Sequence, residues 1–255
     1  YNFETLRGES APIDAFFCAL GREPDGERIE YYRLLDELTA RFPDVWFENC
    51  SSGGGRVDGE IFRRMDLNWT SDYTDMIARQ FIQYGYLGCF PANTMLGLVT
   101  AEDRQEAGIS LGYKFDVTMQ GVLGVGDDLS AWGPEQKAVA AAKIALYKQI
   151  RSTVQQGKVY RLLSPFEGDR NALQYVARDG HEAVLMCYNR DFNIRETSPE
   201  FSRAYLVRLQ GLDPGAVYTV EGYDGTYTGA NLMQVGLGWP TNKAFDSRII
   251  RITRQ

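Results

Sequence analysis

Residues 47–75, FENCSSGGGRVDGEIFRRMDLNWTSDYTD, hold most of the residues whose types and spacing could carry chemistry. Cys50 is followed by two serines and then by a run of glycines, and Trp69 and Asp72 come about twenty residues later. Glycines after a strand let backbone N–H groups approach a ligand closely. A carboxyl group beside an indole face could act as a general acid next to the apolar C–H patch of a sugar ring.

Both features also have other interpretations. A phosphate cradle needs its glycines to open a helix, usually with Lys and Ser or Thr after them, whereas Arg56-Val57-Asp58-Gly59 follows here. A plain flexible connector is the simplest alternative for the glycines. Asp72 could instead belong to the first turn of a helix that Ser71 or Thr74 caps. These residues alone leave the alternatives open.

The remaining reactive side chains narrow the class of reaction. The one histidine, His181, lies in ARDGHEAV, and we expect it to be exposed in a turn between two strands rather than part of a catalytic triad. Carboxylates would then do any acid–base work. The cysteines lack zinc-ligand spacing, so no metal or other cofactor is predicted. Cys18, Cys89 and Cys187 are predicted to be small buried thiols, which fits a cytoplasmic protein.

Composition and charge exclude several partners. The 255 residues are 44% hydrophobic and 24% charged, as in globular proteins with a sizeable core. A net charge of -7 without basic clusters argues against nucleic acid or an anionic membrane surface as the main partner. There is no apolar run of membrane-spanning length. The first ten residues, YNFETLRGES, show no signal-peptide pattern.

The first part of the chain alternates predicted helices with predicted strands, which indicates parallel βαβ units. Apolar spacing and capping signals predict the helices, and short apolar runs with glycine-rich exits predict the strands. The expected helices are residues 25–42, 74–85 and 134–156, and the expected strands lie within VWFEN (45–49), LGCFPANTMLG (87–97) and KFDVTMQGVLGVGDDL (114–129). We expect the VWFEN strand to be buried.

From about Lys158 the pattern changes to short β-rich runs separated by turn signals. These runs are ALQYVA, EAVLMCYN, AYLVRLQGL, VYTVEGY and RIIRITRQ. They predict an antiparallel β domain, in the form of a small sandwich. The fold class is therefore α/β followed by all-β, with a domain boundary near residue 157 that separates residues 1–157 from residues 158–255.

The motifs FENCSSGGGRVD and WTSDYTD together resemble the signature of glycoside hydrolase family 36, the microbial α-galactosidases. The similarity continues through IQYG, the helix with YKQIR, YRLLSPFE and GLDPGAVYTV. The family combines an amino-terminal β domain, a catalytic (β/α)8 barrel of the TIM type and a carboxy-terminal β-sandwich. The resemblance implies that residues 1–157 are the second half of the barrel and residues 158–255 the sandwich. The upstream part of the same protein, or further copies in a homo-oligomer, would then be its partners.

The resemblance also implies a retaining mechanism with two aspartates. Asp72 matches the acid/base of the family's W-x-S-D motif. Cys50, Gly53 and Gly54 match the loop that lines the galactose subsite, and Trp69 falls where the family has a subsite tryptophan. The implied substrates carry terminal α-linked galactose, as in melibiose and raffinose. N-acetylgalactosamine substrates and galactosyl transfer stay open within the family.

The nucleophile position departs from the family pattern. The resemblance implies an aspartate within the first few residues, and Asn2 stands in its place. Asparagine cannot form a covalent glycosyl ester, so the chain looks catalytically incomplete unless another carboxylate serves, and Glu4 is the nearest. The alternative function is a non-catalytic galactoside-binding or assembly protein. In either case the chain is expected to be a portion of a larger protein or an altered form.

Overall fold

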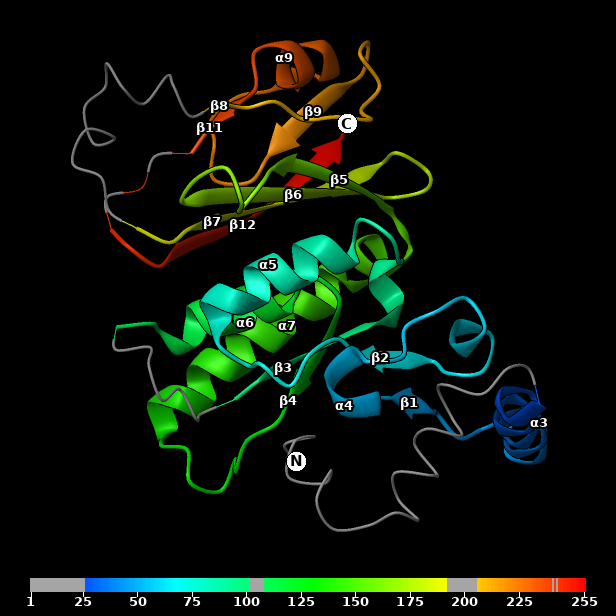
Figure 1. Cartoon of the computed structure of the whole chain (residues 1–255). Helices are drawn as coiled ribbons and strands as arrows, with labels where there is room; N and C mark the ends of the chain where they lie inside the picture. Colours follow the sequence, from blue (N-terminus) through cyan, green and yellow to red (C-terminus); the bar gives the residue numbers. More distant parts are fainter. Residues whose placement is uncertain (1–25, 101–107, 192–205, 240, 242) are drawn as a thin grey trace. The chain divides into compact units, whose positions relative to one another are not determined.

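The computed structural model describes residues 26–100, 108–191, 206–239, 241 and 243–255 (Figure 1). Asn2, Glu4 and Cys18 therefore lie outside the described residues. The chain divides into two compact units, Tyr1–Asp72 and Tyr73–Gln255, which are treated in turn.

In the described part of the first unit the first element is helix α3 (Gly26–Arg41), which confirms the helix predicted over residues 25–42. Tyr32 and Leu35 on this helix pack with Ile61 in a small core. Ile61 opens a short 3-10 helix (Ile61–Arg63), and Arg64 after it contacts Asp36 through Nε at 2.7 Å. The apolar contacts and the ion pair together hold α3 against the segment that leads to the second strand.

Two short parallel strands follow in this unit, β1 (Glu48–Asn49) and β2 (Leu67–Trp69). The buried strand predicted for VWFEN is wrong in extent and in burial, because Val45 and Trp46 are 51% and 74% exposed. The backbone N–H of Phe47 donates to the Asp66 carboxylate rather than to a strand partner. The Asp66 side chain thus accepts the main-chain hydrogen bond of Phe47 that the predicted strand would have made to a neighbouring strand.

Among the described residues of the second unit before Lys158, three α-helices and two strands alternate along the chain. Helix α5 spans Met76–Tyr86, β3 spans Met95–Val99, α6 spans Leu111–Thr118, β4 spans Val122–Val125 and α7 spans Pro134–Gln156. Strands β3 and β4 are parallel. The predicted helices over residues 74–85 and 134–156 are confirmed. The strand predicted within residues 87–97 is found only at the end of that segment, because β3 begins at Met95 and continues to Val99.

Helix α6 was not predicted, because the segment 114–129 reads as one strand in the sequence. Residues 113–118 of this helix are all buried, and the polar and apolar residues of KFDVT (114–118) alternate with the period of a strand rather than a helix. Ser110 caps the helix, since its hydroxyl accepts from the backbone N–H of Tyr113 at 3.2 Å. The strand in this segment is confined to β4.

The rest of the second unit is β-rich. A six-stranded sheet has the order β10-β9-β12-β7-β6-β5, and all its pairings are antiparallel. Strands β8 and β11 form a separate antiparallel pair, and a short helix, α9, completes the region. The bounds are β5 Lys158–Leu163, β6 Arg170–Val176, β7 Glu182–Asn189, β8 Leu206–Val207, β9 Val217–Val220, β10 Tyr227–Thr228, α9 Gly229–Gln234, β11 Leu237–Gly238 and β12 Asp246–Arg254. The prediction of antiparallel β structure after residue 157 is confirmed.

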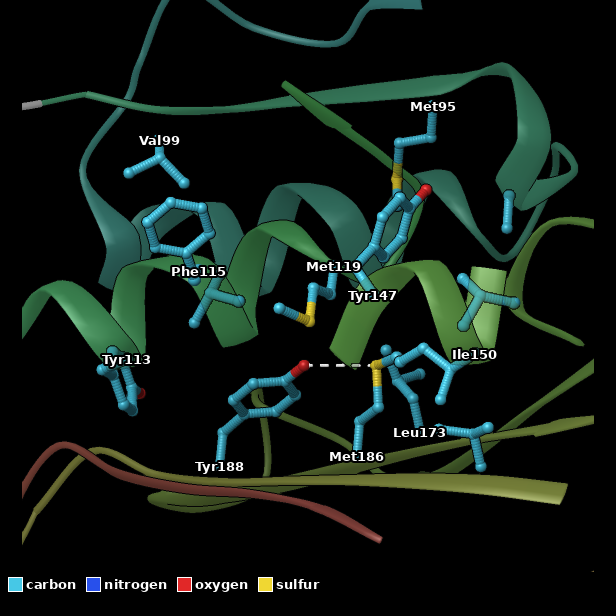
Figure 2. Packing of buried hydrophobic residues seen from close by; sticks show 14 of the residues in the cluster. Met95, Val99, Tyr113, Phe115, Met119, Tyr147, Ile150, Leu173, Met186 and Tyr188 are labelled. Atoms are coloured by element: carbon cyan, nitrogen blue, oxygen red, sulfur yellow. Dashed lines mark hydrogen bonds between the residues drawn. The ribbon is translucent and has the colours of Figure 1, made fainter. Parts of the chain in front are cut away.

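Strands β6 and β7 are buried on both faces. Alternate side chains of a strand point to opposite faces, and here each set joins a different core. One set packs with α6, α7 and β3, and Figure 2 shows Tyr188 and Met186 of β7 pointing toward the helices. The other set packs with β8, β11 and α9. The sheet is therefore the layer that joins the helices to the rest of the β region.

A buried carboxylate, Asp116, marks the contact of α6 with α7 and β12. Its oxygens accept from Lys143 Nζ at 2.6 and 2.7 Å and from Ser247 Oγ at 2.8 Å. The side chain of Asp116 is 3% exposed and that of Lys143 is 26% exposed. Burial, with a smaller contribution from Asp246, raises the pKa of Asp116 despite the opposing attraction of Lys143.

We expect Asp116→Asn to change how stability depends on pH. Because the pKa of Asp116 is higher in the folded protein than its ordinary value of 3.8, the folded state binds more protons above that pH. The stabilising contribution of this group is full below that value and is lost as pH rises through the folded pKa. Asparagine does not titrate, so the variant should gain stability relative to the unaltered protein as pH rises.

Urea unfolding measured from about pH 4 to about pH 7 checks this expectation. Asp224→Asn, in an exposed turn, is the control that should follow the unaltered protein. Parallel pH profiles for the unaltered protein and Asp116→Asn would contradict the prediction.

Candidate active site

The serine-glycine run folds as a left-handed turn rather than as the start of a helix. Ser51, Ser52, Gly53 and Gly54 have φ of 46°, 56°, 68° and 89°. The turn is closed by the N–H of Gly54, which donates to the Cys50 carbonyl at 2.8 Å. Short α4 (Ser51–Gly54) thus lacks the regular turns whose aligned N–H groups would bind a phosphate.

The glycines pack directly against the W-T-S-D segment. A Cβ at Gly53 would lie 2.5 Å from the backbone N of Asp72 and 2.9 Å from its Cγ. A Cβ at Gly54 would lie 2.6 Å from the carbonyl oxygen of Thr70. Real Cβ atoms do not approach other atoms this closely, so only glycine lets the two segments meet here. The interpretation of the run as a flexible connector is therefore wrong.

The side chains of Trp69 and Asp72 are joined by a hydrogen bond. The indole Nε1–H donates to Asp72 Oδ1 at 2.9 Å. Trp69 is buried at 8% exposure, whereas Asp72 is exposed. The fixed indole therefore orients one carboxylate oxygen and leaves the group accessible from solvent.

Asp72 lies outside the helix that follows it. Helix α5 begins at Met76, and its N-cap is Asp75, whose carboxylate accepts from the backbone N–H of Ala78 at 2.7 Å. The alternative in which Ser71 or Thr74 caps the helix and Asp72 decorates its first turn is therefore wrong.

Sequence reasoning missed a pair of buried asparagines beside this site. Asn49 of β1 and Asn68 of β2 are aligned in the parallel register, and they are 3% and 0% exposed. Asn49 Nδ2 donates to Asn68 Oδ1 at 2.8 Å. The sequence offered only adjacency as a signal, because Asn49 directly precedes Cys50 and Asn68 directly precedes Trp69.

The described cysteines and the histidine are placed as follows. Cys50 and Cys89 are exposed and Cys187 is buried, so the prediction of a buried thiol is confirmed for Cys187 and wrong for Cys89. Burial raises the pKa of the Cys187 thiol. His181 is exposed in the turn between β6 and β7, as predicted. Among the described residues, no group of three or more His, Cys, Asp or Glu side chains could hold a metal ion.

A pocket of about 250 Å³ lies elsewhere in the first unit. It is lined by residues after α3 and around the 3-10 helix, among them Phe42, Trp46, Phe62 and Arg63. None of the predicted site residues in the described part of the chain lines it.

None of the described helices meets both requirements of a membrane span, which are sufficient length and sufficient hydropathy.

Comparison with known protein families decides the classification. The Melibiase family matches residues 26–157, and the glycosyl hydrolase family 36 C-terminal domain matches residues 170–252. The chain belongs to glycoside hydrolase family 36. The two matches cover both the left-handed glycine turn with its W-T-S-D segment and the β-rich region.

Several alpha-galactosidases are similar to this chain over most of its length. Alpha-galactosidase AgaA of Geobacillus stearothermophilus is 40% identical over 211 residues, which are 82% of this chain and 28% of that protein. Alpha-galactosidase C of Emericella nidulans is 37% identical over 88% of this chain and 29% of its own length. The crystal structure of alpha-galactosidase AgaB from Geobacillus stearothermophilus matches with a TM-score of 0.83 at 35% identity, over 90% of this chain and 31% of that one. The chain thus spans about three-tenths of the length of these relatives.

Proposed function

We propose that the protein is a retaining α-galactosidase that releases terminal α-linked galactose from oligosaccharides of the melibiose and raffinose type. The observation that carries the proposal is the direct packing of Gly53 against Asp72, whose carboxylate Trp69 holds. A solved structure of a variant of AgaA contains raffinose, and its 35% identity over 88% of this chain supports the choice of substrate.

In this proposal Asp72 protonates the glycosidic oxygen while a second carboxylate, which Glu4 or the upstream part of the protein would supply, attacks the anomeric carbon and forms a glycosyl ester. Asp72 later removes a proton from the water that hydrolyses this ester and releases galactose. Its accessible carboxylate, oriented by the indole N–H of Trp69, suits both steps. Cys50, Gly53 and Gly54 line the galactose subsite. Trp69 acts on the acid/base through its N–H, since most of its surface is buried.

We place these residues in the second half of a (β/α)8 barrel, followed by a carboxy-terminal β-sandwich, with a boundary near residue 157. Support comes from the parallel pairs β1–β2 and β3–β4 and from the antiparallel six-stranded sheet. The two family matches, ending at residue 157 and beginning at residue 170, fit this division. The remaining barrel strands, and any homo-oligomer, would come from outside this chain. A cytoplasmic location stays a prediction.

The second candidate function is galactoside binding without turnover. It rests on one observation in the sequence, Asn2 at the position that the family resemblance gives to the nucleophile. Retaining hydrolysis needs a second carboxylate that forms the covalent intermediate, and asparagine cannot supply it. Asn2 and the alternative Glu4 both lie outside the described residues.

Galactose release and thiol protection together test the two candidates. The hydrolase should release galactose from melibiose and raffinose, whereas the binding protein should not. With either function, saturating galactose should slow alkylation of the exposed Cys50 thiol by iodoacetamide about tenfold, because a bound sugar at the loop would cover it.

Cys89 is the internal control, since it is also exposed and lies outside the proposed site. Mass spectrometry of the alkylated peptides reports both thiols in one sample. Equal protection of Cys50 and Cys89, or none of either, together with no galactose release, would refute both candidate functions.

A further inference from the structure

The hydrogen bonds around Asn49 fix the orientation of the neighbouring asparagine amide. Asn49 Nδ2 donates to the carbonyl oxygen of Arg56, and its Oδ1 accepts from Ser51 Oγ at 3.1 Å. A carbonyl oxygen can only accept, so the nitrogen of Asn49 must be on that side. The same nitrogen also faces Asn68 at 2.8 Å, which requires the oxygen of Asn68 to point toward Asn49.

The amide nitrogen of Asn68 is therefore directed away from Asn49. This nitrogen is buried and has no hydrogen-bond partner, in a residue that is 0% exposed. Leaving a buried amide without a partner is destabilising, and native proteins contain few such groups. Exchanging the nitrogen and oxygen of the Asn68 amide would place its NH₂ group against the NH₂ group of Asn49. The exchange would therefore not satisfy the Asn68 nitrogen.

Position connects this unpaired donor with the proposed galactose site. Asn68 directly precedes Trp69, whose indole holds Asp72, and its register partner Asn49 directly precedes Cys50. Both strands end here, and in α/β folds the carboxyl ends of parallel strands are where ligands bind. A second buried oxygen without a partner, Thr70 Oγ1, follows two residues along the chain. Two polar atoms without partners thus belong to the residues on either side of Trp69 in the sequence.

We propose that Asn68 is a substrate-binding residue whose Nδ2–H donates to one hydroxyl oxygen of the galactose ring. The proposal deepens the proposed function and rests on it. The sugar hydroxyl supplies the acceptor that the amide lacks, while the Asn49 bond keeps the amide from rotating. Galactose specificity then depends on β2 itself as well as on the Cys50 loop.

Asn68→Asp tests the proposal with minimal change of shape. Aspartate keeps the oxygen that accepts from Asn49 and replaces the Nδ2 donor with an acceptor. We expect galactose to bind the full protein about tenfold more weakly after this change, as measured by isothermal titration calorimetry. Asn171→Asp is the matched control, because Asn171 on β6 is also 0% exposed with an unpartnered Nδ2 and lies far along the chain from the site. The control should bind galactose like the unaltered protein.

A series of monodeoxygalactoses identifies the partner hydroxyl. One deoxy sugar should bind the unaltered protein about tenfold more weakly than galactose and should bind Asn68→Asp equally weakly. If galactose binds the unaltered protein and Asn68→Asp with the same affinity, the inference is wrong and the proposed function stands. If the unaltered protein does not bind galactose at all, the proposed function fails and the inference fails with it.

A measurement on the unaltered protein covers the case in which Asn68→Asp does not fold. With ¹⁵N-labelled asparagine, galactose should shift the side-chain NH₂ resonances of Asn68 and leave those of Asn171 in place. Asn68→Ser, which is smaller and uncharged, assigns the signal by its loss. An unchanged Asn68 signal at saturating galactose would overturn the proposal.

Discussion

Replacing Asp72 with asparagine is expected to lower the kcat for galactose release from raffinose and melibiose about 10²–10⁴-fold, the usual range for loss of a general acid–base group. Asparagine preserves the shape of the side chain and can still accept from Trp69 Nε1, so the segment should keep its conformation. The asparagine amide lacks the carboxyl proton that Asp72 would transfer. The kcat would fall because neither departure of the leaving sugar nor activation of water would be assisted.

The dependence on the leaving group makes this prediction specific. A sugar is a poor leaving group that needs protonation, whereas p-nitrophenolate departs with little help. Asp72→Asn should therefore lose far less in kcat/KM on p-nitrophenyl α-galactoside than on raffinose. Equal losses on both substrates would show that Asp72 does not act as the acid.

Asp75→Asn is the matched control for this substitution. Asp75 lies three residues away and caps α5, and asparagine serves almost as well as an N-cap. This variant should keep activity within about twofold of the unaltered protein on both substrates. If Asp75→Asn lost as much activity as Asp72→Asn, the acid/base role could not be assigned to Asp72.

Gly53→Ala is expected to lower kcat/KM about 10²-fold, the effect of a displacement of about 1 Å at a catalytic group. The added Cβ would lie 2.5 Å from the backbone N of Asp72, an atom that cannot rotate out of the way. Alanine is also strained at φ of +68°. Relief requires the loop or the Asp72 segment to move, and either movement changes the position of the carboxylate.

Gly59→Ala provides the comparison for this loop. Gly59 lies in the same unit and is exposed, and a Cβ there would meet nothing within 4 Å. The Gly59→Ala variant should therefore have the same kcat/KM as the unaltered protein. Circular dichroism and melting temperature would separate a local displacement from global unfolding in Gly53→Ala. A fully active Gly53→Ala with an unchanged melting temperature would show that the close approach of the two segments has no role in catalysis.

Much of the fold could be predicted because its signals are local. Helix α7 begins at Pro134, and Gly157 follows its last residue, so both of its ends can be predicted from the sequence. Turn signals likewise separate the β-rich runs. Helix α6 gave no such signal because its polar residues, which are buried, alternate with apolar ones in the pattern of a strand. β1 was overextended because an apolar run such as Val45-Trp46 was assumed to be buried, and these side chains are exposed.

The candidate site could be predicted only as a set of residues. Cys50, the glycines, Trp69 and Asp72 were identified from residue types and from the family resemblance. Their connections were not visible in the sequence, because the contact of Gly53 with Asp72 joins residues 19 positions apart. The Trp69–Asp72 hydrogen bond depends on a side-chain conformation. Asn68 was missed because a single asparagine in a short strand carries no pattern.

The burial of β6 and β7 on both faces has a consequence for the modularity of this protein. Leu173 and Tyr188 belong to the core under the helices, while Leu185 on the same sheet belongs to the core on its other side. A sheet shared in this way cannot be transferred to another protein as an independent domain. Its removal would expose the apolar face of the helices on one side and that of the β8, β11 and α9 region on the other. The secondary structure therefore changes near residue 157, but the apolar packing continues across that point. The helices before it and the strands after it have to be retained as one unit.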